Sequence, residues 1–155
     1  MKPERILILG IGNLLAGDEG AGIHAVMRME RAALPGHVTL LDGGTGGFHL
    51  LSLFREYPVI ILIDAALDGR PPGSVAVRAP RFARDFPPSL SAHDIGLRDL
   101  LESAELLGPL PRVHLVTISI EKIPALSLEL SDPVSRALPA VERAVFELVE
   151  AATSA

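Results

Sequence analysis

The sequence contains no cysteine, few aromatic residues and no cluster of positive charge. Without cysteine, the protein cannot use a thiol nucleophile, exchange disulfides, or bind zinc or iron–sulfur clusters through thiolates. Aromatic residues make up 4% of the chain and apolar residues 48%, so the core must be aliphatic. The net charge is −5 and no segment is strongly basic. Nucleic acids and anionic membranes are therefore not expected as partners, because both require clustered Lys or Arg.

Long apolar runs are also absent. No stretch reaches the roughly 18 apolar residues that a membrane span requires. Residues 2–5 (KPER) precede a strand-like run rather than the apolar core of a signal peptide. We therefore expect a soluble, cytoplasmic protein, and a monomer because no exposed apolar stripe is evident. The length of 155 residues fits a single domain over residues 1–155.

Aliphatic runs alternate with helical patterns along the chain. This alternation predicts an α/β fold, a three-layer sandwich with a mostly parallel five-stranded sheet and helices on both faces. A turn-like segment without a helix, Asp68–Gly73, follows the third strand, so the fourth strand should be an antiparallel edge strand. The expected strands are Arg5–Ile11, Val38–Leu41, Val59–Asp64, Ser74–Arg78 and Val113–Ile120; the expected helices are Gly20–Leu34, Phe48–Arg55, Ile95–Leu107 and Pro133–Ala151; Pro80–Ser91 should be an irregular loop.

A glycine-rich segment at residues 10–22 (GIGNLLAGDEGAG) follows the first strand. It fails the dinucleotide-binding pattern because Leu15 stands where the third glycine should be, although Asp42 resembles a ribose-binding acid. The adjacent carboxylates of Asp18 and Glu19 would repel a phosphate and instead suit a cation. The alternative is that both acids stabilise a helix N-terminus, which is the more natural interpretation of Asp18 as an N-cap. Asn13 is best explained as a turn residue.

Two further residues could join Glu19 at the same edge of the sheet. Asp64 follows the most apolar strand, at the carboxyl edge where open α/β sheets bind ligands. His93 lies between the proline-rich loop and a helix. The alternatives are that Asp64 is satisfied by local backbone amides and that His93 is merely solvent-exposed. The other four histidines are better explained as structural or solvated residues: His24, His37, His49 and His114.

One imidazole and two carboxylates form an ordinary ligand set for a borderline divalent ion such as Zn, Ni or Mn. A serine triad is not evident, because no Gly-x-Ser-x-Gly motif occurs and Ser91 has no obvious orienting base beyond His93. If the protein is an enzyme, a metal-activated water or a metal-polarised carbonyl is the natural chemistry.

Several segments in this order resemble the hydrogenase maturation endopeptidase family. They are residues 10–22, residues 42–47 (DGGTGG), the strand that leads into Asp64, residues 91–96 (SAHDIG) and residues 128–134 (LELSDPV). The resemblance covers nearly the whole chain. It implies a protease that removes the C-terminal extension from the large-subunit precursor of a nickel–iron hydrogenase once nickel has been inserted.

The family's metal-binding glutamate, aspartate and histidine correspond to Glu19, Asp64 and His93, which would serve as both metal-binding and catalytic residues. The nickel would be presented by the precursor, and other divalent ions such as Zn or Cd could occupy the same site. The loop that contains Asp42, Gly43, Gly44 and Thr45 would help to select the partner hydrogenase. The resemblance also suggests an aspartic-type classification.

The chain departs from the family in two places. Residues 119–124 (SIEKIP) replace the Gly-Ile-x-Pro sequence that often follows the fifth strand, and His24 replaces an aliphatic or basic residue. The first departure leaves the class of hydrogenase open, because this segment would flank the substrate groove. The alternative function is a non-catalytic maturation chaperone of similar fold that binds metal or nucleotide. Two features favour it: no nucleophile is evident, and Asp42 resembles a ribose-binding acid.

Overall fold

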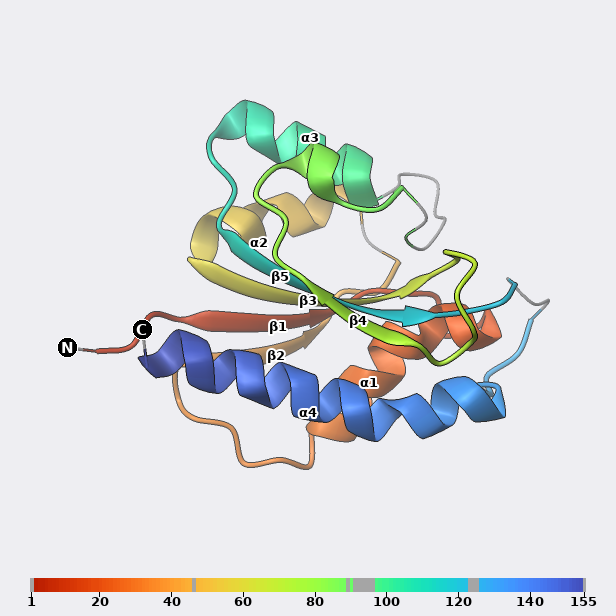
Figure 1. The fold of residues 1–155 in the computed structure, drawn as a ribbon. Coiled ribbons are helices and arrows are strands. Elements are labelled where there is room, and N and C mark those ends of the chain that lie inside the picture. The colour runs from red at the N-terminus through yellow and green to blue at the C-terminus, as the bar shows by residue number, and fades with distance from the viewer. Residues whose placement is uncertain (1, 46, 89, 91–96, 123–125, 155) are drawn as a thin grey trace.

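A computed structural model describes residues 2–45, 47–88, 90, 97–122 and 126–154. Five strands form one sheet in the order β2-β1-β3-β5-β4 (Figure 1). The strands are β1 (Ile6–Gly10), β2 (Val38–Asp42), β3 (Val59–Ala66), β4 (Val75–Arg78) and β5 (Arg112–Ser119). The α-helices are α1 (Ala21–Met29), α2 (Leu51–Glu56), α3 (Leu97–Leu107) and α4 (Asp132–Ser154), and short 3-10 turns occur at η1 (Gly17–Gly20), η2 (Phe48–Leu50) and η3 (Ala83–Asp85).

Helices cover both faces of the sheet, which makes three layers (Figure 1). One face packs under α1 and α4 and buries Ile8, Ile61 and Val116; the other packs under α2 and α3 and buries Leu9 and Leu62, among others. Neighbouring residues of β1 and β3 belong to opposite cores because side chains alternate along a strand. The aliphatic strands are therefore buried on both faces, as the sequence predicted.

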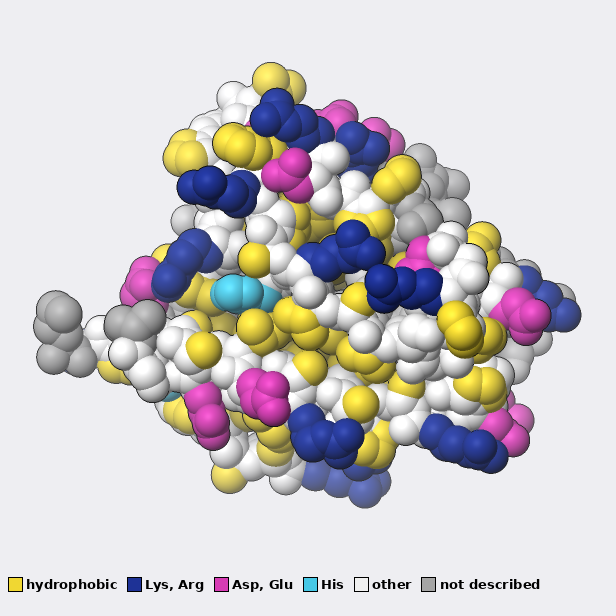
Figure 2. All heavy atoms as spheres, in the orientation of Figure 1, with side chains coloured by type: hydrophobic (Ala, Val, Ile, Leu, Met, Phe, Trp, Pro, Cys, Tyr) yellow, Lys and Arg dark blue, Asp and Glu magenta, His cyan; other side chains and the backbone are white. Residues whose placement is uncertain are grey.

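The predicted strand directions are confirmed. The β1, β2, β3 and β5 strands run parallel to their neighbours, whereas β4 is an edge strand that pairs antiparallel with β5. In the described part of residues 80–91, the expected irregular loop contains only η3 and one bridge residue, Leu90. The face in Figure 2 intersperses Lys and Arg with Asp and Glu, so it carries no patch of a single sign.

Several predicted element ends differ from the observed ones, most of them by one to three residues. The β3 strand does not end at Asp64 but continues to Ala66, because its ladder with β5 extends to the pair Ala66 and Ser119. The helix expected over Gly20–Leu34 is shorter: η1 comes first, and α1 ends at Met29. Beyond Met29 the side chains of Glu30 and Arg31 are exposed and provide no apolar stripe.

The α4 helix is the longest element and crosses the whole sheet (Figure 1). It continues through Pro139, which a helix interior normally disfavours. Its buried face contributes Val134, Val141 and Val145 to the core shared with α1. Among the described residues, none of the helices combines the length and apolar character needed to cross a bilayer.

Candidate functional site

Glu19 lies in η1, the tight turn between β1 and α1, and only 3% of its surface is exposed. The turn folds back on the strand exit, since the Asn13 amide donates to the Glu19 carbonyl at 3.3 Å. Gly12 permits this approach: a Cβ atom there would lie 2.4 Å from the Glu19 carbonyl oxygen, and its φ is +159°. The glycines therefore place an acidic residue inside the protein rather than a phosphate site on its surface.

A second glycine allows the start of α1 to lie close against the sheet. At Gly22, in the first turn of α1, a Cβ atom would lie 2.3 Å from the Ile63 carbonyl oxygen and 2.4 Å from that of Ile11. No side chain fits between α1 and the exits of β1 and β3. Consequently η1, which carries Glu19, contacts β3, which carries Asp64.

Asp64 lies inside β3 and is fully buried. Its Oδ1 atom accepts a hydrogen bond from the Ala65 amide at 2.8 Å, so a local backbone contact exists, as the structural alternative expected. Strand alternation places Asp64 on the same side of the sheet as Leu62, toward α2 and α3. Its partner in β5 is Thr117, also buried. A carboxylate in such surroundings is costly unless it has polar partners or a ligand.

His93 lies outside the described residues, so its position relative to the two carboxylates stays a prediction. Its described neighbours in sequence are Leu90, which forms a bridge with Ala66, and Leu97, where α3 begins. Within the described part of the chain, no three His, Asp or Glu side chains are grouped as a metal site. The structure thus brings together the elements of two of the three predicted ligands.

The loop predicted to select the partner lies next to the glycine-rich turn. The Gly43 amide donates to the Gly10 carbonyl at 2.8 Å, and the Gly12 amide donates to the Gly44 carbonyl at 2.9 Å. Asp42 Oδ1 accepts the Gly44 amide at 2.8 Å, which forms a local turn. Thr45 is exposed. The loop is therefore held at the same edge of the sheet as Glu19, while its role in selection stays a prediction.

Asp18 is not the helix N-cap that the sequence suggested. The N-cap of η1 is Ala16, and no side chain caps this turn. The Asp18 carboxylate instead reaches Ser131, 113 positions later, and accepts its amide and its hydroxyl at 2.7 Å each. Sequence reasoning missed this pair because nothing in the local pattern links two residues so far apart. Asn13 behaves as the turn residue expected, since its Oδ1 accepts the Leu15 amide.

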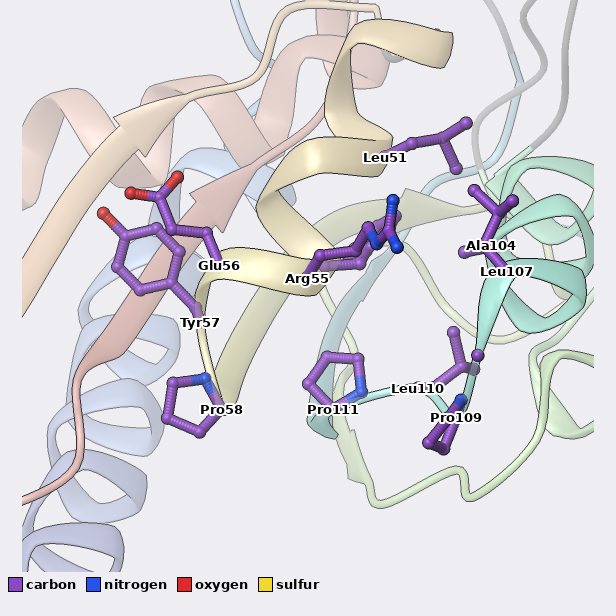
Figure 3. Close-up of a pocket in the computed structure, with 12 residues that line it drawn as sticks. Leu51, Arg55, Glu56, Tyr57, Pro58, Ala104, Leu107, Pro109, Leu110 and Pro111 are labelled. Carbon is purple, nitrogen blue, oxygen red and sulfur yellow. The ribbon is translucent and has the colours of Figure 1, made fainter.

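Two cavities differ in their place relative to the carboxylates. The first, of about 440 Å³, is lined by residues that include Asp18, Ser127 and Ser131, and it lies at the carboxyl edge next to η1. The second, of about 410 Å³, lies where α2 leads into β3 and α3 leads into β5, at the opposite edge. Figure 3 shows that prolines and leucines surround this second cavity, with Arg55 projecting from α2. Only the first cavity adjoins the predicted site.

The remaining histidines play no role at this edge that the structure reveals. The half-buried His114 lies in β5, where burial and, secondarily, the Arg112 charge lower the pKa of its imidazole below 6.5. His37 makes a 2.8 Å hydrogen bond to Thr153, and His49 is exposed. His24, in α1, has a buried Nε2 atom without a hydrogen-bond partner among the described residues.

Comparison with known proteins identifies the family. The model of the hydrogenase maturation protease family matches residues 23–148. The HupD hydrogenase expression/formation protein of Rhodobacter capsulatus is 42% identical over 113 residues, 71% of this chain and 54% of the relative. HupD of Thiocapsa roseopersicina is 36% identical over 155 residues, 97% of this chain and 66% of the relative. The chain therefore spans between half and two thirds of the length of these two relatives.

The fold has close counterparts among solved structures. The hydrogenase maturating endopeptidase HybD from E. coli superposes with a TM-score of 0.83 and 30% identity, over 94% of this chain and 92% of that one. The family and the E. coli protein are known as proteases or endopeptidases, with no catalytic class in their names, so the aspartic-type classification stays a prediction. Fold, family model and relatives agree: this chain belongs to the hydrogenase maturation protease family.

Proposed function

We propose that the protein is an endopeptidase that removes the C-terminal extension of a nickel-loaded hydrogenase large-subunit precursor. One observation carries this proposal: two buried acidic residues, Glu19 and Asp64, come from elements that contact each other at the carboxyl edge of the sheet. Membership of the maturation protease family indicates that the reaction in which this pair would take part is peptide cleavage. The nickel ion belongs to the precursor, so it is part of the substrate.

The position of the chain near His93 supports its inclusion in the site. Leu90 pairs with Ala66, which lies two residues beyond Asp64 on β3. His93 follows Leu90 by three residues, a span of at most about 10 Å in an extended chain. Two carboxylates and an imidazole suit a borderline divalent ion such as nickel. These three side chains would complete the coordination of the precursor's nickel and orient the scissile peptide beside it.

The test is co-expression of the protein with a hydrogenase large-subunit precursor, with and without nickel, followed by mass spectrometry of the precursor. The wild type should shorten the precursor only when nickel is supplied. The variants Glu19→Gln and Asp64→Asn should cut at least about 100-fold more slowly, more than the 10–100-fold lost when a residue merely orients a ligand. His93→Ala should do the same.

The control is Glu147→Gln, which removes an exposed carboxylate from α4. It should cut like the wild type, and thermal unfolding should show that all variants fold. Efficient cutting by Glu19→Gln and Asp64→Asn would refute the proposal.

The same protein samples distinguish the proposed endopeptidase from the alternative, a non-catalytic maturation chaperone. Calorimetry with nickel, zinc or cadmium and with adenine nucleotides tests the binding of each ligand alone. Tight nucleotide binding without precursor cleavage would favour a chaperone. The structure gives Asp42 a partner within its own turn, Gly44, which accounts for this acid without a bound ribose.

A further inference from the structure

Residues 126–131, which we call the strap, cross the glycine-rich turn at the carboxyl edge. The Ser127 amide donates to the Leu15 carbonyl, and the Gly17 amide donates to the Ser127 carbonyl, both at 2.8 Å. These two bonds form a parallel bridge between Ala16 and Ser127. The strap is therefore held by backbone bonds to the segment that leads into Glu19.

Asp18 fixes the other end of the strap. Its two carboxylate oxygens accept separate hydrogen bonds from Ser131, one from the amide and one from the hydroxyl, at 2.7 Å each. Bonds to an ionised carboxylate are roughly twice as strong as neutral ones, and two of them define an orientation as well as a distance. Asp18 directly precedes Glu19 in η1, so one short turn carries both the buried Glu19 and the residue that binds the strap.

The strap presents apolar side chains to solvent. Leu126 is 87% exposed and Leu128 is 63% exposed, one on each side of Ser127. Leu15, whose carbonyl accepts the Ser127 amide, is 55% exposed. Single exposed leucines are ordinary, but Leu126 and Leu128 lie on a strap whose other residues line the cavity of about 440 Å³. Exposed apolar side chains next to a cavity are typical of an interaction surface.

We propose that Asp18 is a positioning residue: it holds the strap beside Glu19, and the strap's leucines contact an apolar stretch of the precursor polypeptide. This inference rests on the proposed function, because a chain that is cut near Glu19 must pass the strap bonded to the same turn. Asp18 itself contacts no reacting atom. It acts through Ser131 by keeping Leu126 and Leu128 in a defined place.

The first test measures kcat and KM for precursor cleavage. Leu126→Ser and Leu128→Ser should each raise KM about tenfold and leave kcat within a factor of about three, because each loses apolar contact that forms only on binding. Both side chains are exposed, so the variants should fold like the wild type. The matched control is Leu106→Ser, which removes a leucine that is 88% exposed near the end of α3 and should leave KM unchanged.

The second test is a double-mutant cycle with Asp18→Ala and Ser131→Ala. Each should lower kcat/KM about tenfold or less. The double variant should lose clearly less than the product of the two losses, since both changes remove the bond between the Asp18 carboxylate and the Ser131 hydroxyl. Ser131→Thr, which keeps the hydroxyl and the amide, should restore activity. A purely structural role would show the same coupling in unfolding free energy but leave KM unchanged.

The outcomes keep the two proposals apart. If the wild type cuts the precursor, Glu19→Gln does not, and the leucine variants and Asp18→Ala keep the wild-type KM, the inference fails while the proposed function stands. If the wild type cuts no precursor, both fall. If Leu126→Ser abolishes self-association in sedimentation and leaves KM unchanged, the strap contacts a second copy of this chain and the inference is overturned.

Discussion

At the residue scale, Gly22 is the position with the least tolerance for change. A Cβ atom there would lie within 2.5 Å of two backbone oxygens, which cannot move without shifting β1 or β3. We expect Gly22→Ala to destabilise the protein by about 3 kcal/mol, at the upper end of overpacking effects. Gly36→Ala is the matched control, because a Cβ atom there meets nothing within 4 Å. Urea denaturation of both variants measures the difference; equal midpoints would contradict the close approach of α1.

His114 makes stability depend on pH. Burial, assisted by Arg112, lowers the pKa of its imidazole in the folded protein below 6.5, so the unfolded chain binds more protons in that range. The contribution of neutral His114 is therefore complete above pH 6.5 and is lost as the pH falls toward the folded pKa. His114→Gln should reduce the difference in unfolding free energy between pH 8 and pH 5. His49→Gln, at an exposed position, should preserve the wild-type difference; the idea fails if both variants behave alike.

The two buried acidic residues could be singled out from the sequence alone. Glu19 stands in a glycine-rich turn and Asp64 follows a run of aliphatic residues, and both are indeed buried. The contact between Asp18 and Ser131 could not be predicted, because the two residues are 113 positions apart and are brought near only by the complete sheet. Whether His93 joins the carboxylates stays a prediction that the cleavage experiment tests.

At the scale of elements, α4 contains an evident imperfection. Pro139 removes an amide donor inside the helix and crowds the carbonyl four residues earlier, at a typical cost of about 3 kcal/mol. Restriction of the unfolded chain offsets about 0.4–1 kcal/mol of this cost. We therefore expect Pro139→Ala to raise stability by about 2 kcal/mol, or roughly 4–8 °C in Tm.

Pro133→Ala is the control, because Pro133 lies in the first turn of α4, where proline fits. It should leave Tm unchanged or lower it slightly. Differential scanning calorimetry distinguishes the two sites. A lower Tm for Pro139→Ala would show that Pro139 stabilises the protein instead of weakening α4.

Element types were easier to predict than element ends. The antiparallel direction of β4 followed from a linker too short for a crossover helix, and the structure confirms it. The end of β3 could not be predicted, because Asp64 looks like a strand terminator while pairing with Thr117 of β5. The end of α1 depended on which side chains find a core to cover, and that is a property of the assembled layers.

At the scale of the whole molecule, the two cores share one sheet. The β3 strand contributes alternate residues to both, so neither core can be lost alone without exposing the other. We expect a single cooperative unfolding transition, as the prediction of one domain over residues 1–155 requires. Near-ultraviolet signals of Tyr57, the single tyrosine, and far-ultraviolet helix signals should give the same urea midpoint. Midpoints that differ would indicate two units.

The two ends of the described chain lie close together, on the side of the molecule away from the strand exits (Figure 1). An affinity tag or a resin attached at either end would therefore project away from η1, the strap and the Asp42 loop. Under the proposed function, immobilised protein should therefore bind the precursor as freely as protein in solution does. Even a partner that covers the whole carboxyl edge of the sheet could bind there without contacting the tag or resin.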